Sequence, residues 1–558
     1  MGMESKADQR YLGFYVLGTS IAVSLFISPW NSIDPTNLPK LVLLSILGFL
    51  AGGFALARVD FFKHGKSRPF VALTSLFLFQ LLIVFLFDNR DFAFKFYGTS
   101  SRNTGTLAYT ALALLMLASA VSASRRVLQR YSISLVAVGS LLSLYGILQS
   151  RGVDFYEFSN AYATNVFGTF GNPNFQSAFM GITGTVALTW VCFSRTQLII
   201  KLGLLVFVGL AVYNIYLSSE QGYLTLLAGF TSAVVIFLLS IKQKILGYLV
   251  LGFGGVAGLF VLAGIFNKGP IADVIYKSSL QARSFYWEAA VRMMIDHPLF
   301  GVGMDGFGDW YRRARTQEIA DFNVGITADT AHNIPLDIGS GGGIPLLLIY
   351  LALVGLALIS IIKILKRTTN FDLVFTSVAA AWFAYQAQSL ISINQIGIGV
   401  WGWSLTGLLI GYELHTRSPE RDNQPKVQRK VIKKQQISAL AVVTSFLFGG
   451  LGLTAAIPPY SAADKFYKAL QSGDAEIIQP AAYLQPNDRA RYLYVAKIMV
   501  DNKLDDRAIK VFSDASRIYP DSFDLWQMWS TVPTATPDQI ARTKSEMRRL
   551  DPYNKEIK

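Results

Sequence analysis

Charged residues are scarce in this chain. Lysine, arginine, aspartate and glutamate make up 15% of its 558 residues, whereas hydrophobic residues make up 52%. An ordinary water-soluble domain carries about a quarter charged residues. The composition therefore excludes a typical water-soluble globular protein.

Cysteine and histidine are rarer still. The single cysteine, Cys192, lies in an apolar run, so the chain has no disulfide framework. The sequence has four histidines, and only His332 has catalytic surroundings. The aspartates of the polar segment around it show no metal-ligand spacing, so we expect neither a metal site nor a cofactor.

Apolar runs of about 18–22 residues, each long enough to cross a bilayer, dominate the first four-fifths of the chain. They predict an all-α fold, a polytopic membrane bundle of about 12–13 spans. The first run has no signal-peptide cleavage site, so we expect it to be retained. The runs lie near residues 11–28, 38–57, 69–87, 105–123, 129–149, 174–193, 196–217, 220–240, 243–266, 344–363, 371–392, 396–415 and 437–457.

The net charge of +14 is distributed unevenly. This is the positive-inside pattern of a membrane protein, and it argues against nucleic-acid binding. It predicts a cytoplasmic N-terminus, and it places the segment 267–343 and the region after residue 458 outside. Lysine and arginine gather in alternate short loops, near residues 58–68, 125–130, 195–201, 242–244, 363–367 and 417–434.

The segment 267–343 is too long to be a simple connector, and loops of this length are usually functional. Residues 280–297 predict an amphipathic helix, because Trp287, Val291 and Met294 recur at helical spacing before Pro298. Arg283 lies one turn before Trp287 on the same stripe. We expect this stripe to lie against the bundle or the membrane interface, with Arg283 near the bundle mouth.

His332 and Asn333 stand at the end of this segment, just before Ile334 and Pro335. Proline suits the first turn of a helix, so His332 should precede a helix N-terminus. The dipole of that helix disfavours imidazolium, and a neutral imidazole can act as a general base. The alternative is a loop residue that only helps to cap the helix.

Two shorter outward segments are rich in turn-forming residues and should fold back on the membrane surface. Residues 96–105 carry Arg102, and residues 167–174 carry Asn172 and Asn174. Arg102 is either a substrate-binding residue or a surface charge. The two asparagines are either ligands or turn residues.

The chain changes character after Pro458 and Pro459. We expect a membrane domain over residues 1–457 and a small helical domain outside the membrane over residues 458–558. The second domain holds helix pairs that end in Tyr519-Pro520-Asp521 or Asp551-Pro552-Tyr553-Asn554. These pairs resemble two or three degenerate tetratricopeptide repeats.

Together these motifs resemble the O-antigen ligase and O-antigen polymerase superfamily over about residues 10–415. The resemblance rests on Arg283 with Trp287, on the turn 298–303, on His332-Asn333 before a glycine-rich helix start, and on the turns 98–105 and 171–174. It implies a membrane glycosyltransferase of the GT-C class. Such enzymes move a glycan from an undecaprenyl-diphosphate carrier to an acceptor hydroxyl on the outer face of the bacterial plasma membrane.

The resemblance makes His332 the general base and Arg283 a ligand of the diphosphate. One departure is Gln221, because many relatives carry an arginine in this turn. The diphosphate would then depend more on Arg283 and Arg102. The further candidates for substrate binding are Asn333, Gln221, Asn172 and Asn174.

We expect metal-independent transfer with inversion, because arginine can neutralise the departing diphosphate. The acceptor is a lipid, a glycan or a protein, so a polysaccharide polymerase and a protein O-oligosaccharyltransferase of this superfamily are alternatives. A lipid or glycan transporter and an envelope scaffold are alternatives of another class. The C-terminal repeats would dock an acceptor or partner protein, and we expect them to be dispensable for the chemical step.

Overall fold

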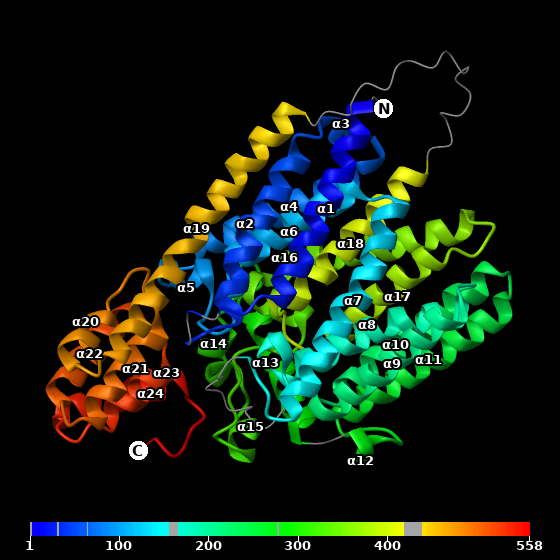
Figure 1. Ribbon diagram of the computed structural model, residues 1–558. Coiled ribbons are helices and arrows are strands. Elements are labelled where there is room, and N and C mark those ends of the chain that lie inside the picture. Colours follow the sequence, from blue (N-terminus) through cyan, green and yellow to red (C-terminus); the bar gives the residue numbers. More distant parts are fainter. Residues whose placement is uncertain are drawn as a thin grey trace.

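The computed structural model describes residues 3–28, 30, 33–63, 65–155, 166–275, 278–417 and 438–557. These residues are mostly helical and contain no strand (Figure 1). The all-α, polytopic fold expected from the apolar runs is confirmed.

A helix occupies each apolar run. Among the described residues, nine helices are long and apolar enough to cross a membrane, namely α2, α4, α7 to α11, α16 and α19. The remaining runs form α1, α6, α17 and α18, of which α6 and α17 have 17 residues each. The bounds are α1 Met3–Leu25, α2 Asn37–Leu56, α4 Arg68–Phe87, α6 Thr106–Ser122, α7 Arg125–Ser150, α8 Pro173–Phe193, α9 Leu198–Ser218, α10 Gln221–Ser240, α11 Lys244–Ile265, α16 Ile334–Arg367, α17 Leu373–Ser389, α18 Ile396–Thr416 and α19 Ala439–Gln471.

The centre of the bundle is formed by α6 and α18, which are buried along nearly their whole length. Gly407 and Gly411 of α18 lie against the backbone of Met116 and Ala120 in α6, where a Cβ atom would clash. Small residues let membrane helices approach closely in this way. At the edge, α11 exposes most of its apolar side chains, as expected of a lipid-facing helix.

The long loop folds into short helices that cover one end of the bundle. Its helix α13 confirms the predicted amphipathic helix, and it buries Arg283, Trp287 and Met294. Val291 is 43% exposed and does not pack into the bundle, so of the two surfaces expected for this stripe only the membrane interface is left for this residue. The buried face is centred nearer Ala290, which leaves Val291 on its rim. The helices of the long loop are α12 Ala272–Ile275, α13 Ser278–Asp296, α14 Phe307–Ala314 and α15 Gln317–Phe322. Elsewhere in the chain lie the short helices α3 Val59–Lys63 and α5 Phe92–Tyr97 and the 3-10 turns η1 Gly65–Ser67 and η2 Gly168–Phe170.

The C-terminal helices have a hydrophobic core of their own, which runs from Phe466 to Leu550 and includes Phe94 from α5. The backbone does not break at Pro458 and Pro459, because α19 continues through them to Gln471. The helices are α20 Ala475–Ala481, α21 Arg489–Asp501, α22 Asp505–Ile518, α23 Phe523–Ser530 and α24 Pro537–Leu550.

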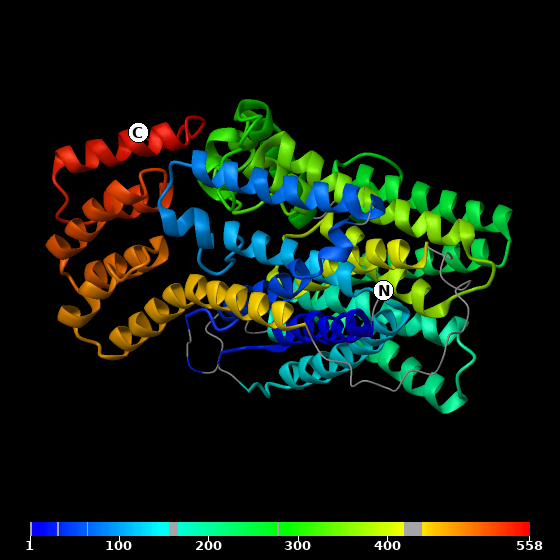
Figure 2. The same ribbon diagram turned by 90° about the horizontal axis from the view of Figure 1, so that it is seen from above.

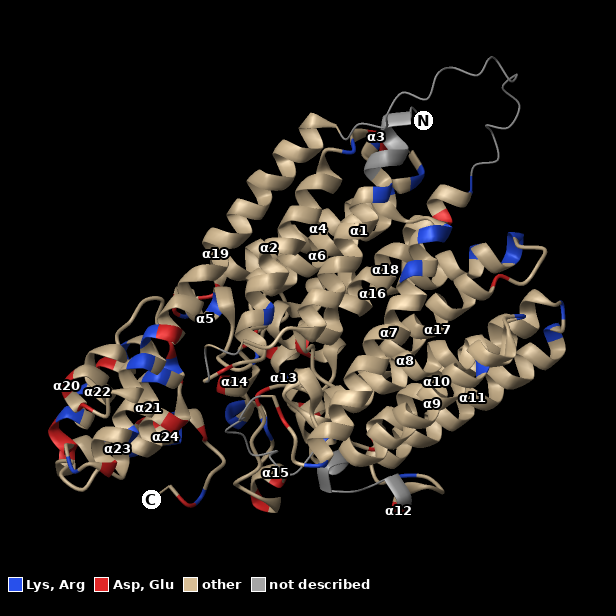
Figure 3. Cartoon of the chain, in the orientation of Figure 1, with Lys and Arg blue, Asp and Glu red and all other residues tan. Residues whose placement is uncertain are grey.

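The two ends of the bundle differ. The N-terminus lies at one end, and α13 to α15 and the C-terminal helices lie at the other (Figures 1 and 3). Seen from above, the C-terminal helices lie beside the helices of the long loop (Figure 2). The long loop and the C-terminal region therefore share one end of the molecule.

Candidate active site at the loop end of the bundle

His332 lies in a tightly held turn. Its backbone adopts φ +51°, a left-handed conformation that is uncommon for a residue other than glycine. On one side, the Asp337 carboxylate accepts the Ala331 N–H at 2.7 Å. On the other, Asn333 is the N-cap of α16, and its Oδ1 accepts the Leu336 N–H at 3.1 Å. These contacts fix the imidazole ahead of the helix, as the sequence predicted.

The imidazole of His332 is oriented by Thr330. Its Nδ1 lies 3.0 Å from Thr330 Oγ1 and 3.3 Å from the Thr330 carbonyl oxygen. Because a carbonyl oxygen can only accept, the second contact assigns the proton to Nδ1 and leaves the lone pair on Nε2. The pKa of His332 is lowered to about 4, first by burial and then by the charge of Arg283. The residue is therefore neutral at pH 7, as a general base must be.

Arg283 is a buried cation beside this imidazole. It is 3% exposed, and within the described part of the chain its Nη1 has no hydrogen-bond partner. Burial lowers its pKa to about 10, so it stays charged at neutral pH. One turn along α13, the Tyr286 ring lies 5.5 Å from the His332 ring, measured between centroids. A buried guanidinium nitrogen without a hydrogen-bond partner is costly, and an anionic ligand would relieve that cost.

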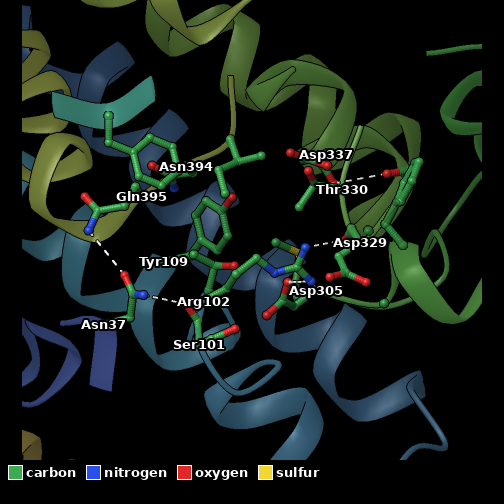
Figure 4. Close-up of a pocket in the computed structure, with 18 residues that line it drawn as sticks. Asn37, Ser101, Arg102, Tyr109, Asp305, Asp329, Thr330, Asp337, Asn394 and Gln395 are labelled. Atoms are coloured by element: carbon green, nitrogen blue, oxygen red, sulfur yellow. Dashed lines mark hydrogen bonds and ion pairs between the residues drawn. The ribbon is translucent and has the colours of Figure 1, made fainter. Parts of the chain in front are cut away.

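Arg102 is placed differently. Its Nη2 forms an ion pair with Asp305 at 2.6 Å, and its Nη1 donates to the Asp329 carbonyl oxygen. Figure 4 shows its guanidinium pointing toward Asp305 and Asp329. Asp305 already balances its charge, so Arg102 ties the segment after α5 to the long loop. It lowers the pKa of His332 less than Arg283 does.

A polar pocket opens beside Arg102 (Figure 4). Thr330 and Asp337 belong to its wall and connect it to the His332 turn, although neither His332 nor Arg283 is among its described lining residues. Asp337 was not predicted from the sequence, where its signal was a carboxylate in the first turn of the helix that follows His332. The polar lining residues are Asn37, Ser101, Arg102, Thr104, Tyr109, Asp305, Asp329, Thr330, Asp337, Ser340, Asn394 and Gln395.

A family model described as O-antigen ligase matches residues 204–351, which include Gln221, Arg283, His332 and Asn333. This match supports the resemblance to the O-antigen ligase superfamily. At the level of the family, the match supports O-antigen ligase-like glycan transfer, and with the many apolar helices it supports a multi-pass membrane protein. No curated protein matches the chain.

Gln221 opens α10 inside the matched O-antigen ligase domain, whereas Asn172 and Asn174 precede that domain. Asn172 caps α8 by accepting the Asn174 N–H at 2.9 Å. Gln221 Nε2 donates to Asn174 Oδ1 at 3.2 Å, and Gln221 Oε1 is buried without a partner among the described residues. These three residues join α8 to α10. The described pocket lining contains none of them, although their neighbour Phe175 belongs to it.

Asn333 is occupied by structural contacts of the O-antigen ligase domain. Besides capping α16, its Nδ2 donates to the Leu390 carbonyl oxygen at 2.9 Å, and the residue is 7% exposed. It therefore links the His332 turn to the segment after α17. The structure supports a positioning role for Asn333 more directly than contact with a substrate.

Proposed function

We propose that the chain transfers a glycan from an undecaprenyl-diphosphate carrier to an acceptor hydroxyl, with His332 as the general base and Arg283 as the ligand of the diphosphate. The observation that carries the proposal is the buried Nη1 of Arg283, which has no hydrogen-bond partner among the described residues and lies next to a neutral imidazole. A catalytic site for this reaction needs both a base and a counter-charge, and these two residues would supply them.

The reaction is a single displacement. The acceptor oxygen attacks the anomeric carbon and forms the new glycosidic bond, while the bond from that carbon to the diphosphate oxygen breaks. The acceptor proton passes to His332 Nε2, and the bond electrons leave with the lipid diphosphate. Arg283 stabilises the added negative charge, because a guanidinium binds phosphate oxygens in a bidentate manner. Attack opposite the leaving group inverts the anomeric configuration.

The outer face of the membrane is the side on which we place this reaction. The basic short loops of the sequence argue for it, because positive loops stay in the cytoplasm. The N-terminus and the site lie at opposite ends of the bundle (Figure 3). A cytoplasmic N-terminus would therefore place His332 and the C-terminal region outside.

Transfer from a purified lipid-diphosphate glycan tests the proposal. We expect His332→Ala to lower turnover by roughly two to four orders of magnitude, which is the usual contribution of a general base, with little change in donor binding. Three acceptors, a lipid A core sugar, a glycan chain and a protein, would be supplied separately, so that the product identifies the acceptor class. A chelator should leave transfer unchanged, because Arg283 supplies the counter-charge.

Arg283→Ala should weaken both donor binding and turnover, and Arg283→Lys should restore little, because an ammonium does not reproduce the planar guanidinium. Arg292→Lys is the matched control, since Arg292 lies on the same helix but is exposed and paired with Glu288. Near-normal transfer by folded His332→Ala protein would refute the role of the base. Full inhibition by the chelator would refute the metal-independent mechanism.

A further inference from the structure

The C-terminal helices dock onto the long loop through a row of ion pairs. Arg313, at the end of α14, has its Nη1 3.4 Å from Asp521 Oδ1, and Arg489 of α21 pairs with Asp309. Most members of this interface are partly exposed. Partly exposed pairs of this kind stabilise a protein only slightly.

One pair in this interface is different. Arg315, just after α14, and Asp551, just after α24, have fully buried side chains. Arg315 Nη2 donates to both carboxylate oxygens of Asp551, at 2.8 and 2.7 Å. Removing Asp551 would be strongly destabilising, because the buried charge of Arg315 would be left without its counter-charge. Asp551 itself has a second, longer contact, since Arg312 Nη1 lies 3.4 Å from its Oδ2.

The Arg315 guanidinium also contacts the segment that leads to the His332 turn. Its Nη1 donates to the carbonyl oxygens of Val324 at 2.9 Å and Ile326 at 3.3 Å. The next residue, Thr327, accepts a hydrogen bond at 3.5 Å from Tyr286, whose ring contacts His332. Arg315 thus connects Asp551 to residues 324–327, which lead to His332.

We propose that Arg315 is a positioning residue for the transfer reaction, and that Asp551 of the C-terminal helices holds it in place. The C-terminal helices then complete the catalytic end of the molecule, and their removal should impair the chemical step. This differs from the expectation from the sequence that they are dispensable. The inference rests on the proposed function of His332, but its structural part can be tested without any transfer assay.

The variant Arg315→Lys tests whether Arg315 positions residues 324–327 or only docks the C-terminal helices onto the long loop. Lysine can keep the charge pair with Asp551, but its single ammonium cannot replace a guanidinium that points two nitrogens in two directions. The matched control is Asp521→Asn, which removes a carboxylate bound to Arg313 and Arg549 in the same interface. That control does not touch the carbonyl oxygens of residues 324 and 326.

The readout is a nitroxide spin label on Thr327→Cys, in a Cys192→Ser background that removes the only native cysteine. Thr327 has an exposed side chain, so a label is tolerated. We expect Arg315→Lys to increase the mobility of the label and to lower turnover about tenfold or more, with the KM for the donor changed less than about threefold. Asp521→Asn should leave both label mobility and turnover unchanged.

Unchanged label mobility in Arg315→Lys would overturn the inference, even if turnover fell. Equal effects of Arg315→Lys and Asp521→Asn would overturn it too, because docking alone would then explain them. If Arg315→Lys fails to fold, Asp551→Asn takes its place with the same two readouts. Because label mobility needs no activity, failure of the proposed function would leave this result interpretable.

Discussion

At the scale of single residues, the two arginines near His332 differ in their partners. Arg102 is paired with Asp305, whereas the Nη1 of Arg283 is unpaired among the described residues. Arg283 is therefore the residue that can bind a substrate anion at little rearrangement cost. The proximity of its charge also helps to keep His332 neutral.

The rate of transfer should be insensitive to pH across the neutral range. The pKa of His332 is lowered from 6.5 to about 4, so the neutral base predominates above about pH 4 and is lost only below it. We expect the acid limb of the kcat/KM profile near pH 4 to 5, with thermal unfolding followed at each pH to confirm a folded enzyme. An acid limb near pH 6.5 would mean that neither burial nor Arg283 lowers the pKa of His332.

The same shift affects stability in a defined direction. Between about pH 4 and 6.5 the unfolded chain binds a proton at His332 and the folded chain does not. His332 therefore lowers the free energy of unfolding as the pH falls through this window. In His332→Gln this contribution should be absent, so its melting temperature should fall less on acidification than that of the wild type.

At the scale of elements, α16 consists of two helices joined at a kink. Gly343 has φ +78° and ψ 173°, a conformation that is almost restricted to glycine. The kink packs against the turn after α13, where Ile344 N–H donates to the Pro298 carbonyl oxygen and Val302 N–H to that of Ser340, each at 2.8 Å. The short first helix, which carries the His332 turn, is thereby held against the loop.

Gly343→Ala should destabilise this arrangement. The backbone conformation alone would cost about 1–3 kcal/mol, and a Cβ atom there would meet the backbone of Leu299 at 2.6 Å. Gly355→Ala is the matched control, because it lies in the same helix with nothing within 4 Å of its Cβ position. Thermal unfolding in detergent should show a lower midpoint for Gly343→Ala only. Equal midpoints for the two variants would show that the kink does not need glycine.

At the scale of the whole molecule, the site depends on parts that are distant in sequence. Segments near residues 37, 102, 305, 330 and 394 line one pocket, and the C-terminal helices contact the long loop through ion pairs. All of these parts lie at the end opposite the N-terminus (Figure 1). The side of the membrane on which that end lies decides on which side the protein can meet its substrates.

Labelling with a membrane-impermeant thiol reagent tests this sidedness. In the Cys192→Ser background, Thr327→Cys should react in intact spheroplasts, whereas Thr369→Cys should react only after permeabilisation. Both side chains are exposed, and Thr369 follows the basic end of α16. The positive-inside rule gives the direction of the prediction. Reaction of Thr369→Cys in intact spheroplasts would place the end that carries His332 in the cytoplasm and contradict the proposed mechanism.

Local patterns in the sequence were sufficient to predict the helices, the helix α13 around Arg283 and the position of His332 before α16. These features follow from apolar periodicity and from helix capping, which involve residues close together in the chain. Only the tertiary structure decided the continuity of α19 through its two prolines, the exposure of Val291 and the pairing of Arg102 with Asp305. It alone decided the bond between Arg315 and Asp551, which are 236 positions apart. Contacts between distant charges depend on how the helices pack, and no local period of the sequence records that packing.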